Sequence, residues 1–269
     1  MILTLFLSGL RVDIDMLTSY DKLKFDNLIT DYALHGKPEQ GIGTYSEKSL
    51  HYILKNFFES DTDCHEVSYK GFVADVKNGS SITEIQSTTF RGLNNKLDAF
   101  LEDSSVRLVF PIISKRRIIW IDPETGDVQR SKRTVSEDIF TLAPELLYVV
   151  EYLRDPSLIV TVVTIEADEY RKLDGWGRYR KNNATKMDIV PTALIDVKDL
   201  DFPDDLEQFV PDSLGEVFLR QEYSKATRLK GRSLWAVLKM LEEMRVIRRV
   251  ENDGKCHRYC RVKYENGNN

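Results

Sequence analysis

One stretch, residues 69–90, constrains this chain more than any other. It reads YKGFVADVKNGSSITEIQSTTF, two extended runs on either side of Asn78-Gly79. Asn-Gly is a preferred pair for a two-residue type I′ turn, because both loop positions need positive φ. The pattern therefore predicts an antiparallel hairpin with this pair as its loop, in which Asp75 lies opposite Ile82.

Two acidic residues come together in this predicted hairpin. Side chains alternate between the faces of a strand, so Asp75, Glu84 and Gln86 are expected on one face. Asp75 and Glu84 then lie diagonally across the strand pair, about 7–8 Å apart. Two carboxylates among buried strands are costly unless a metal ion or a basic partner balances them. A divalent cation fits between them; the alternative is an ordinary hairpin whose acids face solvent.

The whole sequence sets the class of protein. Its 269 residues suffice for a domain of about 200 residues and a smaller one. No apolar run approaches the roughly 20 residues that span a bilayer, so no membrane partner is expected. The cysteines are few and odd in number, three in all, which argues against a disulfide framework and favours the cytoplasm. Walker and GxGxxG motifs do not occur in a usable context, so no nucleotide cofactor is expected.

Charge is distributed unevenly. Residues 213–269 hold 13 Lys and Arg against 7 Asp and Glu, a net charge of +6, whereas the rest of the chain has a net charge of −11. A basic C-terminal part on an acidic body is typical of a protein that meets a polyanion at that end. The alternative is a soluble domain with a surplus of lysine and arginine.

A helix is expected before the hairpin, from Thr44 to about Glu59. Thr44 and Glu47 have the spacing of a capping box, which predicts the start of this helix. Glu47 either caps the helix alone or reaches the hairpin as a third acidic residue. His51, in the same helix, is expected to be packed or solvated and not to bind a ligand.

Hydrophobic periodicity predicts the elements that surround the hairpin. The order is helix, strand, strand, strand, helix, strand. The flanking elements are a strand at 65–69, a helix at 91–103 and a buried strand at 106–113. Later elements are a second hairpin at 115–121 and 127–130, a helix at 136–154 and a buried strand at 158–165.

This order of elements, with Asp75 on the second strand and Glu84-Ile85-Gln86 on the third, resembles the PD-(D/E)xK nuclease superfamily. Restriction enzymes, junction resolvases and repair nucleases belong to it, and the resemblance covers about residues 44–113. It implies an α/β fold, a restriction-endonuclease-like mixed sheet flanked by helices. It also implies that Asp75 and Glu84 bind Mg²⁺ or Mn²⁺, that the carbonyl of Ile85 helps, and that Glu47 completes the set. Such a metal holds the scissile phosphate and lowers the pKa of the attacking water.

The sequence departs from the family pattern twice. Ala74 stands where the pattern has proline, and Gln86 replaces the usual lysine, which positions the water and stabilises the charged transition state. A glutamine donates hydrogen bonds but brings no charge. Some restriction enzymes of the superfamily carry glutamine at this place. Lys96, Arg91 or Lys70 is a candidate source of the missing charge.

A basic loop is expected at residues 174–186, DGWGRYRKNNATK. Arg178 and Arg180 alternate there with aromatic residues, a combination that contacts phosphates and stacks on bases. The alternative is a solvated surface loop.

The C-terminal part follows a linker-like stretch at 201–213. Two helices at about 218–229 and 233–244 and two strands up to Lys263 resemble a winged helix-turn-helix over about residues 204–264. This resemblance implies that the second helix enters the major groove and that the wing touches the backbone. The expected DNA contacts, together with Lys96 of the first domain, are Lys225, Arg228, Lys230, Arg232, Lys255 and Arg258. The alternative is a protein-docking module.

Cys256, His257 and Cys260 do not have the spacing of a standard zinc site, and a fourth ligand is missing nearby. They are expected to be strand residues of the wing.

Together these features predict a domain at 1–203, a winged helix at 204–269 and a Mg²⁺-dependent DNA phosphodiesterase. Asp75 and Glu84 would hold the metal, Gln86 would orient water or phosphate, and Glu47 would assist. One alternative is a catalytically inactive nuclease-fold protein that binds DNA or regulates. Another is a nuclease-fold toxin or defence component whose second domain binds protein. The sequence leaves a monomer and a homodimer open.

Overall fold

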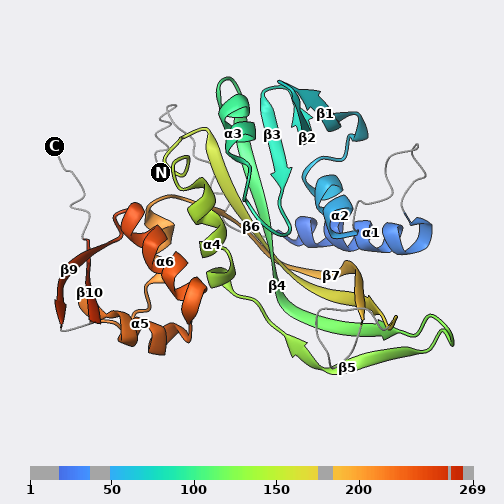
Figure 1. Ribbon diagram of the computed structural model, residues 1–269. Helices are drawn as coiled ribbons and strands as arrows, with labels where there is room; N and C mark the ends of the chain where they lie inside the picture. The colour runs from blue at the N-terminus through green and yellow to red at the C-terminus, as the bar shows by residue number, and fades with distance from the viewer. Residues whose placement is uncertain (1–17, 37–48, 175–183, 254–255, 263–269) are drawn as a thin grey trace, which may run out of the picture.

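The apolar runs predicted as strands form the centre of one large sheet in the computed structural model, which describes residues 18–36, 49–174, 184–253 and 256–262 (Figure 1). Of the described residues, seven strands pair in the order β1-β2-β3-β4-β6-β7, with β5 on β4. The pairs β3–β4 and β4–β6 are parallel and the others antiparallel. The strands are β1 (His65–Tyr69), β2 (Phe72–Asn78), β3 (Ser81–Ile85), β4 (Ser105–Ile121), β5 (Val128–Val135), β6 (Leu158–Lys172) and β7 (Thr185–Leu200).

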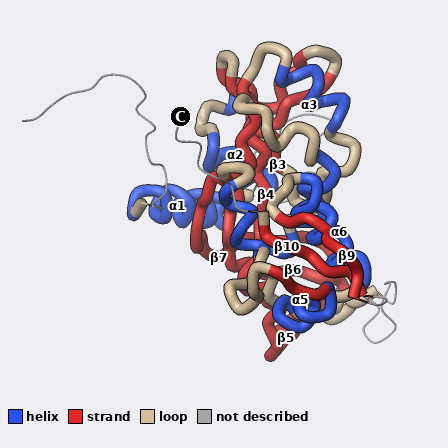
Figure 2. The backbone as a smooth tube through the Cα atoms, turned by 90° about the vertical axis from the view of Figure 1, so that its left-hand side faces the viewer, coloured by secondary structure: helices blue, strands red, loops and turns tan. Residues whose placement is uncertain are grey.

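Helices cover both faces of this sheet. On one face lie α1 (Ser19–His35) and α2 (Ser49–Phe58), and on the other α3 (Asn94–Leu101) and α4 (Ala143–Leu146). Alternating apolar residues of β4 explain why both faces are covered. Leu108 and Phe110 pack with α3 and α4, while Val109 and Ile113 pack with α1 and α2 on the other face. Figure 2 shows α1 beside β7. The chain is therefore a mixed α/β protein with a large mixed sheet flanked by helices.

The predicted hairpin is present as β2 and β3, but its register differs from the prediction. Lys77 pairs with Ile82, the residue predicted to lie opposite Asp75. The loop is therefore Gly79-Ser80 and not Asn78-Gly79. The glycine has a φ of 57° at the first loop position, where a type II′ turn prefers glycine. The preference of Asn-Gly for a type I′ turn did not decide the register.

Other elements differ from the prediction as well. The second predicted hairpin is present, since β5 pairs antiparallel with the end of β4, from Arg116 to Ile121. Its first arm is not a separate strand, because β4 continues into it from the buried strand and pairs with β6 along its whole length. Residues 136–154 form short helical pieces rather than one helix: η2 (Ile139–Thr141), α4 and η3 (Leu147–Val149). Pro144 lies in the first turn of α4 and helps to break the run. The 16-residue strand β7 was not predicted.

The C-terminal part contains the expected helices and hairpin, plus one short strand that was not expected. Its elements are β8 (Val217–Leu219), α5 (Arg220–Thr227), α6 (Gly231–Glu243), β9 (Ile247–Asp253) and β10 (Cys256–Arg261). The three strands form a separate sheet in the order β8-β10-β9. The stretch predicted as a linker contains η4 (Asp204–Phe209), with Leu206 and Phe209 fully buried.

The C-terminal part packs directly on the body of the protein. One hydrophobic cluster includes Phe110 of β4, Leu146 of α4 and Leu238 of α6. Across the surface, Arg232 donates a hydrogen bond of 2.8 Å to the hydroxyl of Tyr148. Within the described residues, none of the helices has the length and apolar character needed to cross a membrane.

Candidate active site

Asp75 and Glu84 lie where the hydrogen-bonded ladder between β2 and β3 stops. The paired register ends at Val76 and Thr83. Beyond this pair, the amide of Ile85 donates to Oδ2 of Asp75 over 2.7 Å, and the amide of Asp75 donates to Oε1 of Glu84 over 3.2 Å. Carboxylates therefore take the place of backbone carbonyls between the two strands. The two acids adjoin as the sequence predicts, although the register that brings them together is different.

Each carboxylate also faces a basic side chain from a helix. Oδ2 of Asp75 lies 3.2 Å from Nε2 of His51 on α2, although the ring nitrogen lacks the alignment of a hydrogen bond. Oε2 of Glu84 accepts a hydrogen bond of 2.6 Å from Nζ of Lys96 on α3. Because α2 and α3 cover opposite faces of the sheet, the acids connect both layers at the gap in the ladder. The expectation that both acids lie on one face of the hairpin was therefore wrong, and so was the alternative that both face solvent.

The surroundings push the pKa values of the two acids in opposite directions. Burial raises the pKa of Asp75, but His51, the amide of Ile85 and Lys96 outweigh it and hold this pKa below its usual value. Burial, followed by the charge of Asp75, raises the pKa of Glu84 to about 7, against the opposing effect of Lys96. The side chain of Glu84 is 1% exposed and that of Asp75 is 17% exposed. Neighbouring acids with separated pKa values are characteristic of sites that bind cations or move protons.

Of the three cations considered for the missing charge, the structure brings one to the acids. Lys96 contacts Glu84, whereas Lys70 pairs with Glu102 at 2.9 Å and Arg91 is exposed. Gln86 follows β3, and its backbone N–H donates a hydrogen bond of 2.9 Å to the carbonyl of Val109. The side chain of Gln86 is half-buried and has no hydrogen bond within the described part of the chain.

The loop between β3 and α3 is held by a buried contact with α4. The carboxylate of Glu145 accepts hydrogen bonds of 2.7 Å from Oγ1 of Thr89 and 2.9 Å from the amide of Phe90. Phe90 is fully buried against Phe110 of β4. This contact restrains the segment that leads from Gln86 to the helix of Lys96.

A residue of β7 holds the first described turn of α2. The carboxylate of Asp188 accepts a hydrogen bond of 3.2 Å from the amide of Ser49 and another from its hydroxyl. The same hydroxyl lies 2.6 Å from the hydroxyl of Tyr32 on α1. An acid at a helix N-terminus satisfies an amide without a partner and complements the helix dipole. The contact therefore sets the position of α2, and with it of His51.

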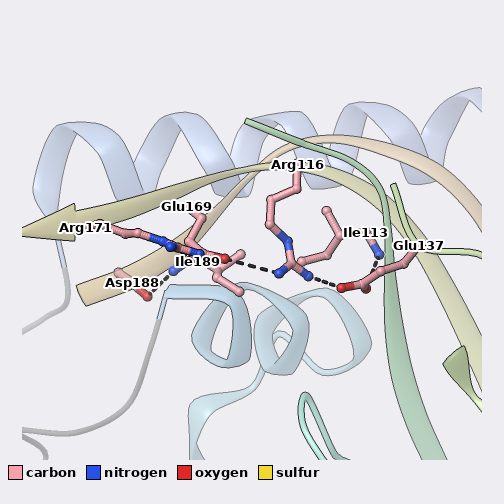
Figure 3. Close-up of polar contacts among 7 residues, drawn as sticks. All are labelled: Ile113, Arg116, Glu137, Glu169, Arg171, Asp188 and Ile189. Atoms are coloured by element: carbon pink, nitrogen blue, oxygen red, sulfur yellow. Dashed lines mark hydrogen bonds and ion pairs between the residues drawn. The ribbon is translucent and has the colours of Figure 1, made fainter. Parts of the chain in front are cut away.

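A chain of ion pairs joins β4 to β6 (Figure 3). Arg116 donates to Glu169 over 3.1 Å and also to Glu137, while Arg171 donates to the other oxygen of Glu169 over 2.6 Å. The side chain of Glu169 is 1% exposed. Such a carboxylate is tolerated only because two guanidinium groups balance it. Oε2 of Glu137 accepts from the amide of Ile113, which ties this network to the centre of the sheet.

The acids fit a divalent cation in part. In the ranges that the structure describes, three or more His, Cys, Asp or Glu side chains do not gather into a group that could hold a metal ion. Asp75 and Glu84 nevertheless adjoin, and magnesium sites commonly use one or two carboxylates, with water and substrate phosphate as the other ligands. The donor set is therefore compatible with a metal that the substrate helps to hold.

Several predicted contact residues lie on the C-terminal part. Lys225, Arg228 and Lys230 are exposed at α5 and the turn before α6. Arg258 is half-buried on β10. Cys256 to Cys260 belong to the same strand, as expected. The predicted residues Glu47, Arg178, Arg180 and Lys255 lie outside the described residues.

The sequence pattern indicated another role for one candidate residue, His51, and did not point to a second one, Asp188. His51 was expected to be packed or solvated, but its Nε2 lies 3.2 Å from Oδ2 of Asp75. One signal was available in the sequence, because His51 follows Glu47 by four residues, the spacing of one turn in the helix predicted there. Asp188 has no local signal, since it caps a helix far away in the sequence.

Comparisons with known proteins identify a matching family, but the matches carry no described activity. The family model described as "Domain of unknown function (DUF8091)" matches residues 48–201. An "Uncharacterized protein" of Treponema pallidum (strain Nichols) is 28% identical over 159 residues, which are 58% of this chain and 62% of the relative. The chain thus spans less than two thirds of the length of the curated relative it matches. No solved structure matches the chain.

Proposed function

The chain belongs to the family described as a domain of unknown function (DUF8091), and we propose that this member is a divalent-metal-dependent DNA phosphodiesterase centred on Asp75 and Glu84. One observation carries the proposal. The two acids adjoin at the gap between β2 and β3, and a lysine from α3 reaches the same place. The order α2-β1-β2-β3-α3-β4, with β3 and β4 parallel, supports a restriction-endonuclease-like arrangement.

Asp75 and Glu84 would hold the metal, Mg²⁺ or Mn²⁺. The carbonyl of Ile85 is a third candidate ligand, because the N–H and C=O of one strand residue point to the same neighbour, and this N–H points to Asp75. The metal would polarise the scissile phosphate and lower the pKa of a water molecule. Asp75 is ionised at neutral pH because its pKa is lowered, so it offers a charged ligand at all relevant pH values.

Lys96 supplies the positive charge that Gln86 lacks. Its ammonium lies 2.6 Å from Glu84, within reach of the position where a phosphate would meet the acids. A cation there stabilises the negative charge that develops on the phosphate in the transition state. Gln86 would orient the water or the phosphate through its side-chain amide. His51 would hold the orientation of Asp75, and Glu47, which lies outside the described residues, would assist.

The C-terminal part would bring the site to DNA as a winged helix. The order β8-α5-α6-β9-β10, with β10 between the other two strands, supports this interpretation. Lys225, Arg228 and Lys230 are exposed, as phosphate contacts must be. Arg232 and Arg258 complete the proposed basic surface, and Lys255, which lies outside the described residues, is a further proposed contact. In this account the partner is DNA and no nucleotide cofactor takes part.

A second candidate is a catalytically inactive protein of the same fold that binds or regulates DNA. The ion pair between Lys96 and Glu84 favours it, because the ammonium already neutralises one of the two acids. In that case the lysine would replace a metal ion instead of assisting one.

Incubation of the purified protein with supercoiled plasmid and Mg²⁺ or Mn²⁺ tests the proposal. We expect nicking or linearisation that falls by at least about 100-fold in Asp75→Asn and in Glu84→Gln. The matched control is Asp63→Asn, since Asp63 is exposed and, among the described residues, its side chain has no hydrogen bond or ion pair with either acid. Cleavage that survives both site substitutions would reject the assigned site. Salt-dependent DNA binding without cleavage would favour the inactive protein.

A further inference from the structure

A groove separates α6 from the strands β9 and β10 in the C-terminal part. It encloses a cavity of about 550 Å³. Leu238 and Tyr259, each 2% exposed, form its apolar floor. Arg220 from the start of α5, Trp235 and Lys239 from α6 and Arg249 from β9 line its sides. Four elements thus place an aromatic ring and cations around one hollow.

Trp235 is the unusual member of this groove. Its neighbours Leu234, Ala236 and Val237 are buried, whereas Trp235 is 53% exposed. A tryptophan buries a large apolar area when it packs in a core, so an exposed indole leaves this stabilisation unused. It sits at the edge of a cavity whose size is typical of sites for small organic molecules. The exposed ring is therefore suited to stack on a planar group that enters the groove.

The charges of the groove favour an anion. Its two carboxylates are each balanced, since Glu243 pairs with Lys239, and Glu242 lies 3.7 Å from Arg249. Arg220 has no ion-pair or hydrogen-bond partner among the residues that the structure describes. The groove therefore keeps an excess of positive charge beside its aromatic ring.

We propose that this groove binds single-stranded nucleic acid, with a base stacked on Trp235 and the phosphates near Arg220 and Lys239. Aromatic platforms in a positively charged groove are the usual means of holding a single strand. Bases within a duplex are stacked on each other and offer no free face to the indole. The inference rests on the proposed function in that DNA is the partner, and it narrows the substrate to DNA with a single-stranded segment or end.

The groove is fixed relative to the body of the protein. Leu238, which forms part of its floor, belongs to the same hydrophobic cluster as Phe110 of β4 and Leu146 of α4. A strand held at Trp235 would therefore enter the protein at a fixed distance from the acids. This would favour cleavage at a set spacing from a junction between single and double strand.

Fluorescence anisotropy tests the proposal without any cleavage. A labelled oligo-dT of about fifteen nucleotides and a blunt duplex of equal length are titrated with the full chain in EDTA. We expect Trp235→Ala to weaken oligo-dT binding by about 5- to 100-fold and Trp235→Phe to keep most of the affinity. Duplex affinity should change less than twofold. Tyr20→Ala is the matched control, because Tyr20 is an aromatic residue of α1 that is 72% exposed and does not line the groove.

Unchanged oligo-dT affinity in Trp235→Ala, or an equal loss with the duplex, would overturn the proposal. So would a loss in Trp235→Phe as large as in Trp235→Ala, because a ring that stacks is retained there. Arg220→Gln provides a second variant in case the first does not fold, and should reduce the dependence of log affinity on log salt by about one. Since EDTA prevents metal-dependent cleavage, a protein that never cleaves DNA can still pass this test. If the protein cleaves DNA but Trp235→Ala does not selectively weaken single-strand binding, only the single-strand proposal fails and the proposed function stands.

Discussion

Lys96 on α3 and Glu84 on β3 form the closest ion pair of the proposed site, with 2.6 Å between Nζ and Oε2. If Lys96 stabilises the charged transition state in place of the lysine that the family motif has at position 86, its removal should stop the reaction and leave the fold intact. We expect Lys96→Met to lower plasmid cleavage by about 100-fold and Lys96→Arg to restore part of it. Lys70→Met is the control, because Lys70 pairs with Glu102 elsewhere. Full activity in Lys96→Met would assign the charge to another residue.

Glu84 should make the stability of the protein depend on pH. Its pKa of about 7 in the folded protein lies above the ordinary 4.5, so the folded state binds more protons between these values. The free energy of unfolding should therefore fall as pH rises through this window, by about 1–3 kcal/mol between pH 5 and pH 8. Asp75, whose pKa is lowered, contributes stability that is lost only below this range.

Urea denaturation of Glu84→Gln at pH 5 and pH 8 isolates this effect. The substitution removes the titration, so the difference in unfolding free energy between the two pH values should shrink relative to wild type. Glu102→Gln, at a carboxylate that is 69% exposed, should keep the wild-type difference. If Glu84→Gln and wild type show the same pH dependence, the pKa of Glu84 is not raised.

Asp188 should stabilise the protein through the helix that carries His51. Removing a side chain that caps a helix N-terminus costs about 0.5–2 kcal/mol. We expect Asp188→Ala to lower the free energy of unfolding by about that amount, measured by urea denaturation. Asp196→Ala is the control, since Asp196 is an exposed acid of the same strand whose carboxylate contacts the next amide of the chain. Equal effects of the two substitutions would contradict the capping role.

Two adjacent basic residues of β4 should differ strongly in their effect on stability. Arg116 balances Glu169, whose side chain is 1% exposed, whereas Lys115 is 58% exposed and pairs with Glu166, which is 33% exposed. Removing one partner of a buried ion pair costs about 3–5 kcal/mol, and exposed pairs contribute about 1 kcal/mol or less. Thermal or urea denaturation of Arg116→Met and Lys115→Met should show this contrast. A loss in Arg116→Met as small as in Lys115→Met would mean that Glu169 does not need this arginine.

Local patterns predicted the order of the elements but not their contacts. The helix, the three strands, the next helix and β4 were predicted correctly, because hydrophobic periodicity is a property of neighbouring residues. The register of the hairpin was not, since Gly79 takes the first loop position and the acids bond across the strands. The segment predicted as one helix at 136–154 forms short pieces, and Pro144 in the first turn of α4 helps to break the run.

The candidate site was predictable only for the residues on the hairpin itself. Asp75 and Glu84 belong to one supersecondary unit, so sequence spacing was enough to bring them together. His51 and Asp188 reach the site or its helix through tertiary contacts, which a single sequence does not encode locally. Lys96 was one of three candidates, and the packing of α3 against the sheet selects it.

The central claim is that Asp75 and Glu84 together bind a divalent cation. Titration calorimetry with Mn²⁺ at pH 8, where Glu84 is ionised, measures this directly in the full chain, without DNA. We predict one bound equivalent in wild type, a loss of this binding in both Asp75→Asn and Glu84→Gln, and retained binding in Asp63→Asn. Mn²⁺ binding that is unchanged in both site variants would contradict the account.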